Sequence, residues 1–306
     1  MKILIGHDGS KSADAALVDL QRAGLPDDAE ALIVSVADTM MVVPTPDYEL
    51  SEQALMSRRV TSGLAYARTQ TAQVIEEANE FASRARDRVQ TYFPLWSVHT
   101  ETLTGMPASE LIRKANEWKP DLIVVGSHGR SPITRFILGS VSKTIVTDSG
   151  HSVRVSRGNI EKDLSEPPKL VIGVDGSSEA EEAVRAVGGR VWPYGTEVRI
   201  IAVDDGGSSL INGGLPMASA QMVAWAENEL TEIGLKVSVL KEKGDPRRVL
   251  FEQARAWDAD SIFVGGRRFS SALQRFQLGS VATALVTKAH CSVEVLRKRD
   301  GSDQRR

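Results

Sequence analysis

The sequence is poor in the residues that build disulfides, metal centres and nucleic-acid interfaces. Its 306 residues include one cysteine, Cys291, which excludes an intramolecular disulfide and a zinc site made of cysteines. Its five histidines do not stand at metal-ligand spacings. The formal net charge is −3, so the basic excess that neutralises nucleic-acid phosphates is missing. We therefore expect no resident metal ion and no nucleic-acid partner.

Long apolar runs and familiar catalytic motifs are missing as well. No apolar stretch approaches the roughly 20 residues of a membrane-spanning helix, and the opening residues 1–6 are too short for the core of a secretory signal. The sequence has no P-loop, no Gly-x-Ser-x-Gly elbow, no His-Glu-x-x-His and no Cys-x-x-Cys. Together with the single cysteine, these absences predict a cytoplasmic protein without membrane contact.

What the sequence does contain is one pattern that occurs twice. Four pairs of segments correspond in order and approximate spacing: 2–10 with 169–177, 120–126 with 259–265, 135–141 with 275–281, and 152–155 with 292–295. A charged stretch that ends in Pro167-Pro168 separates the two copies. We therefore expect a first domain over residues 1–157, a linker over 158–168 and a second domain over 169–299.

Each copy alternates short apolar runs, typical of buried parallel strands, with helical stretches. The expected strands are 2–7, 31–37, 97–103, 122–126 and 152–156, then 169–174, 197–203, 236–241, 261–265 and 292–296. The expected helices include 12–23, 71–92, 107–118, 141–147 and one that begins near residue 217. This order predicts an α/β fold in which two repeated, doubly wound domains each have a five-stranded, mostly parallel sheet flanked by helices. Ligands of such sheets bind beyond the carboxyl ends of the strands.

The two copies differ after their second strand. The first copy has a long segment over residues 40–68, whereas the second has a glycine-rich segment that starts at Gly206. Both segments begin near the expected ligand edge. A lid over a ligand and a plain surface loop are both compatible with this pattern.

A set of glycines follows the fourth strand of the first copy. Gly126 and Gly129 leave backbone amides uncovered, which lets phosphate oxygens approach. Gly139-Ser140 opens the next helix, where free amides and a partial positive charge suit an anion. The hydroxyls of Ser140 and Ser142 are candidate donors to the same anion. The pattern indicates a phosphate site, although a turn-rich loop would also use these glycines.

Two further residues of this loop are candidates for the site, and the Asp8 carboxylate is considered as a catalytic group. His128 and Arg130 supply charge or hydrogen bonds next to the expected phosphates, although His128 also fits a simple loop histidine. Asp8 ends the first strand, but a carboxylate without a visible partner is not an acid–base pair. We therefore assign no catalytic residue.

The spacing of these glycines resembles the ATP-binding signature of the universal stress protein family, and the resemblance covers almost the whole chain twice. It implies an adenine nucleotide alpha hydrolase-like fold and ATP as the ligand, with Mg²⁺ able to arrive on the phosphates. It implies that Asp8 contacts the adenosine and that the backbone of Val36 recognises adenine. The phosphate positions that the resemblance implies are Gly126, Gly129, Gly139, Ser140, Val141 and Ser142.

The second copy departs from this signature. Its candidate site residues are Asp175, Val203, Gly265, Gly266, Gly279 and Ser280. The middle glycine is missing, because Arg268 or Phe269 takes its place. A side chain there either blocks phosphate or, together with Arg267, holds phosphate by charge. A degenerate copy retained as a scaffold is the alternative.

The last strand of each copy is an expected sheet edge, and exposed edges seek partners. Arg154 and Glu294 occupy the same place in the two strands with opposite charge. In the resembling family such strands pair antiparallel across a dimer. We therefore expect an intramolecular pseudo-dimer, with a homodimer of two chains as the alternative.

These observations predict an ATP-binding regulatory protein of the stress-response type, in which nucleotide occupancy shifts a conformational or assembly equilibrium. Two alternatives stay open: a slow ATP-hydrolysing or adenylating enzyme, and a nucleotide-free dimerisation scaffold. The pattern does not separate ATP from AMP, ADP or a cyclic nucleotide.

Overall fold

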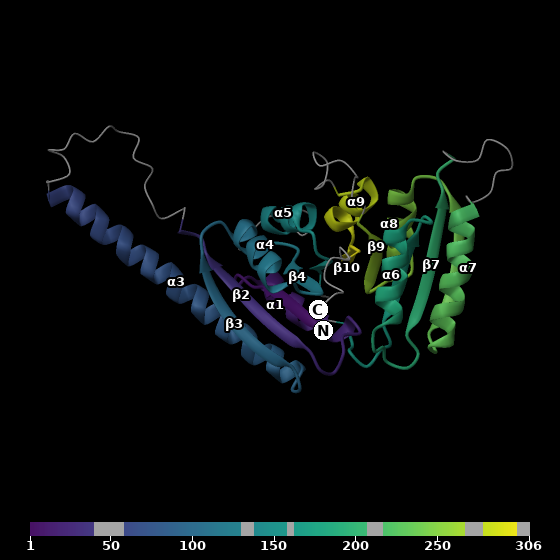
Figure 1. Cartoon of the computed structure of the whole chain (residues 1–306), viewed down its shortest axis with the longest axis horizontal. Coiled ribbons are helices and arrows are strands. Elements are labelled where there is room, and N and C mark those ends of the chain that lie inside the picture. The colour runs from purple at the N-terminus through teal and green to yellow at the C-terminus, as the bar shows by residue number, and fades with distance from the viewer. Residues whose placement is uncertain (40–57, 130–137, 158–161, 207–216, 267–277, 299–306) are drawn as a thin grey trace.

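One continuous sheet of ten strands forms the spine of the computed structural model (Figure 1). The structure describes residues 1–39, 58–129, 138–157, 162–206, 217–266 and 278–298. The strand order is β3-β2-β1-β4-β5-β10-β9-β6-β7-β8, so the second half repeats the order of the first in reverse. Within each half the neighbouring strands are parallel. The expected α/β class, with two repeated parallel sheets flanked by helices, is confirmed.

The strands lie within two residues of the expected bounds, because long β-branched runs bounded by polar residues leave little room for other structure. The first half contains β1 Lys2–Gly6, β2 Glu30–Ala37, β3 Ser97–Thr104, β4 Leu122–Gly126 and β5 Val153–Ser156. The second half contains β6 Lys169–Val174, β7 Glu197–Asp204, β8 Lys236–Lys243, β9 Ser261–Gly265 and β10 Ser292–Leu296.

Two of the helices begin at serine caps. Ser10 and Ser177 cap the helices after the first strand of each half, and their hydroxyls accept from the amides of Ala13 and Ala180. The helices of the first half are α1 Lys11–Asp19, α3 Arg58–Tyr92, α4 Pro107–Trp118 and α5 Ser140–Asp148, with a short 3-10 turn over Leu20–Arg22. Those of the second half are α6 Ser178–Gly188, α7 Met217–Glu232, α8 Pro246–Ala256 and α9 Ser280–Lys288.

Helix α3 is longer than expected. It starts at Arg58 rather than near residue 71, so the C-terminal part of the segment 40–68 is helical and not a loop. Residues 58–68 include three arginines, two alanines and one leucine, which favour a helix, and a single glycine, Gly63, does not stop it. The remainder of that segment, 40–57, and most of the glycine-rich segment of the second half, 207–216, lie outside the described residues.

Helices cover both faces of the sheet and enclose three apolar clusters. The face under α1 and α3 carries a cluster that belongs to the first half, and the face under α6 and α7 carries one that belongs to the second. On the opposite face, one cluster includes Leu111 of α4, Ile145 of α5, Leu250 of α8 and Leu285 of α9. This shared core runs beneath both halves without interruption.

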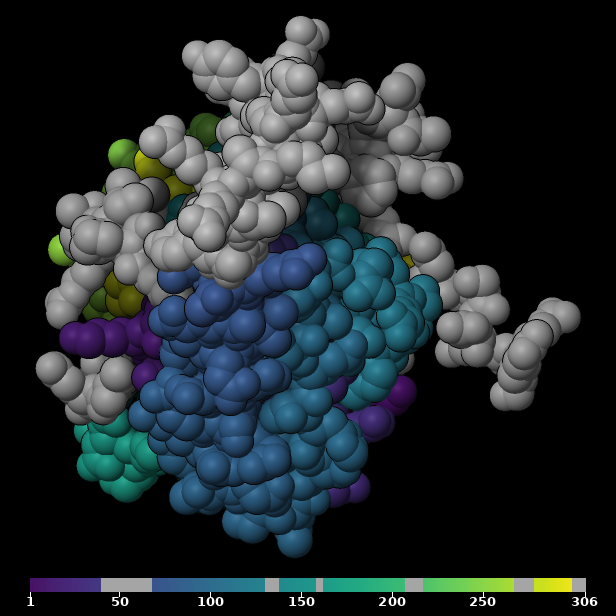
Figure 2. Space-filling view, turned by 90° about the vertical axis from the view of Figure 1, so that its left-hand side faces the viewer, coloured from purple at the N-terminus to yellow at the C-terminus, as the bar shows by residue number. Residues whose placement is uncertain are grey.

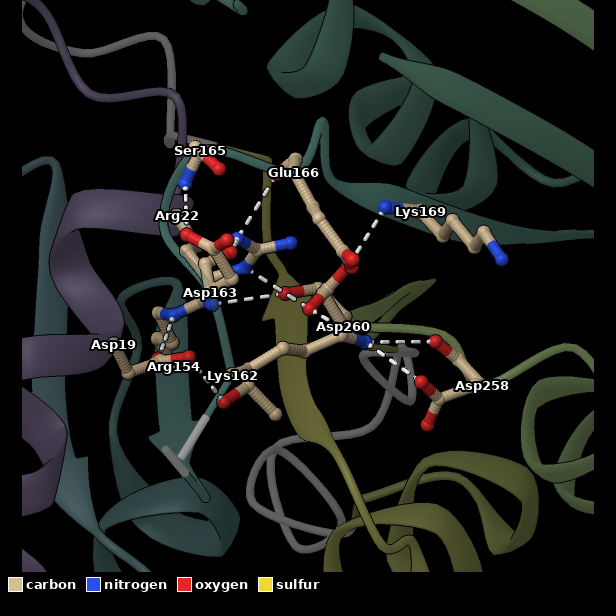
Figure 3. A network of polar contacts seen from close by, with 12 residues as sticks. Asp19, Arg22, Arg154, Lys162, Asp163, Ser165, Glu166, Lys169, Asp258 and Asp260 are labelled. Carbon is tan, nitrogen blue, oxygen red and sulfur yellow. Dashed lines mark hydrogen bonds and ion pairs between the residues drawn. The ribbon is translucent and has the colours of Figure 1, made fainter. Parts of the chain in front are cut away.

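The two halves meet through their last strands, as the sequence predicts. Strand β5 pairs antiparallel with β10, and Arg154 stands opposite Glu294. The described part of the linker lies against this joint (Figure 3). The Arg22 guanidinium donates to the carbonyl oxygens of Asp163 and Glu166 at 2.8 and 3.0 Å, and its Nε bonds the Asp260 carboxylate at 3.0 Å. One arginine of the first half thus ties the linker to the second half.

The end of the molecule farthest from the second half is covered by α3. Figure 2 shows that face, on which the blue residues of α3 and of the segment after it form most of the surface. In the described ranges, none of the helices is both long and apolar enough to cross a membrane.

Candidate functional site

A cavity of about 300 Å³ lies beyond the carboxyl ends of β1, β2 and β4. It collects side chains from four distant parts of the first half. All the described candidates of that half line it: Asp8, Val36, Gly126, His128, Gly129, Gly139, Ser140, Val141 and Ser142. The remaining candidate, Arg130, lies outside the described residues. The sheet edge therefore brings together the residues that the sequence pattern singles out.

Asp8 is held in a tight turn at the rim of the cavity. Its Oδ1 accepts from the amide of Ser10 at 3.0 Å, and Gly9 between them has a φ of +77°, which favours glycine. A Cβ atom at Gly129 would lie 3.2 Å from the Asp8 Oδ2. The missing side chain at Gly129 thus leaves open the space in front of the Asp8 carboxylate.

Three serines, which we call the serine brace, fix the loop after β4: Ser12, Ser127 and Ser142. The Ser12 Oγ accepts from the amide of His128 at 3.0 Å, and the Ser127 Oγ hydrogen-bonds the His128 Nδ1 at 2.8 Å. The Ser142 Oγ donates to the carbonyl oxygen of Gly126 at 2.6 Å. Because this hydroxyl already has a buried acceptor, a bond from it to a phosphate, as the sequence predicts, would have to replace the bond to Gly126.

The packing of α1 supplies a further reason for a glycine at position 126, which the sequence reasoning did not find. A Cβ atom there would lie 2.8 Å from the backbone of Ser12, closer than such contacts allow. Gly265 is the same case in the second half, where a Cβ atom would lie 2.6 Å from the backbone of Glu179. These two glycines let the helix after the first strand pack closely on the fourth strand.

The start of α5 is the part of the cavity whose chemistry suits an anion. Its N-cap is Gly139, which has no side-chain oxygen to offer to the amides of Ser140, Val141 and Ser142. The amide of Gly139 itself donates to the carbonyl oxygen of Ser127 at 2.8 Å. A helix start of this kind carries about half a positive charge and free donors. Ser140 is exposed, so its hydroxyl is available beside these amides.

An apolar floor completes the cavity. Val34, Val125, Leu111, Leu138 and Pro107 line it together with the candidates. Such a surface accommodates a flat, weakly polar ring system, whereas the start of α5 suits a charged group. The cavity therefore combines an apolar lining, which the sequence spacing did not reveal, with a helix start that suits an anion, as the spacing predicts.

His7 is a lining residue that the sequence reasoning missed as a site residue. It is buried, its Nδ1 accepts from the amide of Gly9 at 3.3 Å, and its Nε2 lies 3.2 Å from the Asp14 Oδ1. Burial lowers the pKa of His7, against the opposing pull of the Asp14 carboxylate. Asp14 in turn pairs with Arg88 of α3 at 2.7 Å. The sequence feature that could have identified His7 is its position directly before Asp8, the aspartate at the end of the first strand.

The second half has a larger cavity, of about 930 Å³, at the equivalent sheet edge. Asp175, Val203, Gly265, Gly279 and Ser280 line it, as the repeat predicts. Gly266 is not among its lining residues. A Cβ atom at Gly266 would meet Val295 at 2.7 Å, and its amide donates to the carbonyl oxygen of Leu296, so it faces β10. Arg267, Arg268 and Phe269 lie outside the described residues.

The wall and mouth of the second cavity differ from those of the first. Glu179, Gly266 and Ala282 occupy the three positions of the serine brace. At the mouth, Asp245 caps α8 and pairs with Arg247 at 2.8 Å, where the first half has Met106. The hydrogen bond from Arg247 lowers the pKa of Asp245. The second cavity is thus wider and more highly charged at its rim.

Metal-binding geometry is not found among the described residues. In these ranges, histidine, cysteine and acidic side chains do not gather in groups of three or more that could hold an ion.

Comparison with known proteins gives matches to universal stress proteins over both halves. The model of the universal stress protein family matches residues 1–157 and again residues 168–297. Universal stress protein MJ0531 of Methanocaldococcus jannaschii is 35% identical over 78 residues, which are 25% of this chain and 46% of that relative. Universal stress protein Rv2005c of Mycobacterium tuberculosis is 24% identical over 216 residues, 66% of this chain and 70% of its own.

The fold has a counterpart of the same extent. A universal stress protein from Archaeoglobus fulgidus aligns with a TM-score of 0.61 and 19% identity, and the alignment covers 97% of this chain and 98% of that one. At that identity the likeness concerns the fold. The first relative is covered over less than half of its length, so its activity does not transfer with the match.

Proposed function

This chain belongs to the universal stress protein family, and on that premise we propose that its first half binds ATP in the cavity beyond β1, β2 and β4. Adenine lies on the apolar floor against Val36 and Leu111, and the Asp8 carboxylate faces the ribose hydroxyls. The phosphates lie at the start of α5 and in the space that Gly129 leaves open. Mg²⁺ enters with the phosphates and is held by their oxygens and water.

The observation that carries this proposal is the pairing of an apolar floor with an uncapped helix start in one cavity. The amides of Ser140, Val141 and Ser142 suit a group that is negatively charged at neutral pH. The serine brace supports the same proposal, because it holds the His128 amide and the Gly126 carbonyl in place before a ligand arrives. A preformed site of this kind loses little conformational entropy on binding.

The biological role that we propose is regulatory. ATP binding would favour the conformation in which the loop after β4 and the start of α5 are held together, and so shift an equilibrium of conformation or assembly. The second half supports the first as a scaffold, because its cavity lacks the serine brace and its rim carries a carboxylate. If the chain instead hydrolyses ATP, and changes in the first cavity slow the release of phosphate, the enzyme alternative would be favoured.

Titration calorimetry on the intact, nucleotide-free chain with ATP and Mg²⁺ tests the proposal. We expect a site that Gly129→Arg removes, because the new side chain fills the space in front of Asp8. The matched control is Thr231→Arg, which adds the same charge on an exposed position of α7 and should leave binding unchanged. Absence of binding at millimolar ATP in the unaltered chain would contradict the proposal.

A further inference from the structure

The joint between the halves contains two fully buried opposite charges. Arg154 of β5 and Glu294 of β10 both have 0% exposure and are direct partners in the antiparallel ladder. Their neighbours in the ladder pair Val155 with Val293 and Val153 with Val295. The register therefore places the two charged residues on the pseudo-two-fold axis that relates the halves. Buried charges at such a place are tolerated only when their partners are satisfied.

Each of these charges has one partner in its own half. The Arg154 Nε donates to the Asp19 Oδ2 at 2.8 Å, a contact drawn in Figure 3. Glu294 accepts from Arg190 of its own half, with an Nη1–Oε2 distance of 3.0 Å. These contacts would survive if the halves were paired differently, so they do not determine which half pairs with which.

The remaining contacts cross the joint and differ between the halves. The Arg154 Nη1 reaches the Glu294 Oε2 at 3.3 Å, and its Nη2 donates to the Ser261 Oγ at 2.8 Å. The Ser292 Oγ donates to the Asp19 Oδ1 at 2.8 Å. The repeat puts Leu122 at the position of Ser261, so a first half has no hydroxyl with which to receive the Arg154 of another first half.

A second set of contacts crosses the joint symmetrically. Arg157 donates to the carbonyl oxygens of Val286 and Thr287 at the end of α9, and Arg297 donates to those of Val146 and His151 near the end of α5. Cations suit helix C-termini. Because both halves carry this arginine, these contacts strengthen any pairing of two halves equally and cannot select between them.

We propose that Arg154 and Glu294 make the joint a recognition surface that accepts only the unlike half. Two first halves joined by their β5 strands would place one Arg154 opposite another, and two second halves would place one Glu294 opposite another. Like charges directly opposite each other in a ladder are destabilising, and here no water would screen them. The partner of each half is the other half of the same chain, because the linker raises its effective concentration. A second copy of the chain joins only by exchanging halves.

Two charge-reversed chains test this selectivity. Arg154→Glu places a carboxylate beside Glu294 and Asp19, and Glu294→Arg places a cation beside Arg154 and Arg190, so each joint opens within its own chain. Mixed in equal amounts, the two chains can restore the native pair between molecules, because one supplies Arg154 and the other supplies Glu294. Light scattering after size-exclusion chromatography should show a new species of twice the chain mass only in the mixture.

A disulfide test covers the case in which a reversed chain fails to fold. In a Cys291→Ser background, Val155→Cys with Val293→Cys should lock the joint within one chain. Val153→Cys with Val155→Cys can cross-link only two first halves to each other, and this variant should form no covalent dimer while Arg154 is intact. Adding Arg154→Met should then permit covalent dimers. Covalent dimers with Arg154 intact, or no new species in the mixture of folded reversed chains, would overturn the proposal.

Discussion

The two cavities of this chain occupy equivalent positions but differ in what surrounds them. Both lie beyond the first, second and fourth strands of their half, and both have a glycine before the helix that faces the ligand. The first is narrow and has three serines behind its loop, whereas the second is wide and has Glu179, Gly266 and Ala282 at those positions. The repeat thus reproduces the position of the cavity without reproducing the side chains around it.

The largest effect is expected from moving one residue of the second half into the first. Ser12→Glu replaces the acceptor of the His128 amide with a larger carboxylate against the β4–α1 contact. We expect ATP affinity to fall by about 100-fold or more, since a lost bond to a buried amide and a misplaced charge each cost about 1–3 kcal/mol. Calorimetry measures the change. Glu179→Ser is the reciprocal variant, and the first site should be unaffected by it.

A smaller loss is expected from Ser142→Ala, the residue that the second half has at Ala282. The change leaves the buried carbonyl oxygen of Gly126 without its side-chain donor. The free energy of unfolding should fall by about 1–3 kcal/mol, with a weaker loss of ATP affinity. On the same samples, urea unfolding measures the change in stability and calorimetry measures the change in ATP affinity. If the variant and the parent chain bind ATP equally well, the hydrogen bond from Ser142 does not contribute to ATP binding.

The pH dependence of stability should distinguish the halves at His7, because the second half has Val174 there. Burial lowers the pKa of His7 in the folded chain below its ordinary value of 6.5. The unfolded chain therefore binds the proton more readily, so stability is present above pH 6.5 and is lost as the pH falls below it. Unfolding curves between pH 7.5 and about pH 5 measure this slope.

The control for that experiment is a second histidine, His290, which is exposed at the surface. Partial desolvation also lowers the pKa of His290, so His7→Gln should remove one part of the slope and His290→Gln another. An unchanged slope in His7→Gln would mean that His7 titrates alike in the folded and unfolded chains.

The smallest effect is expected at the cavity mouths. Met106→Asp gives α4 the N-cap that Asp245 gives to α8, and Asp245→Ala removes it from α8. The first change should raise Tm slightly and the second should lower it slightly, because a cap side chain satisfies an amide of the first helical turn. Thermal unfolding followed by circular dichroism compares the two. Changes of the same sign would show that capping does not control these helix starts.

The sequence allowed the sheet to be predicted in detail, because its inner strands are apolar runs whose limits are marked by polar residues. The glycines of the first cavity were found because their spacing is unusual. The roles of Gly126 and Ser142 were not found, since each depends on a residue more than ten positions away that meets it only in the fold. His7 escaped notice because one buried histidine has no spacing pattern of its own.

The length of α3 was missed for a related reason. The expected helix began only where an amphipathic pattern became regular, whereas the structure starts it at Arg58, directly after a serine in the sequence. Helix propensity over residues 58–68 was the better guide there.

The shared core under α4, α5, α8 and α9 couples the stability of the two repeats. Because a single apolar layer belongs to both repeats, neither repeat can lose its tertiary structure without exposing the other's side chains to water. The pair should therefore melt in one cooperative transition, as a single-domain protein does. A ligand that binds only the first repeat then protects the second as well, so that ATP would govern the lifetime of the whole molecule through a single occupied pocket.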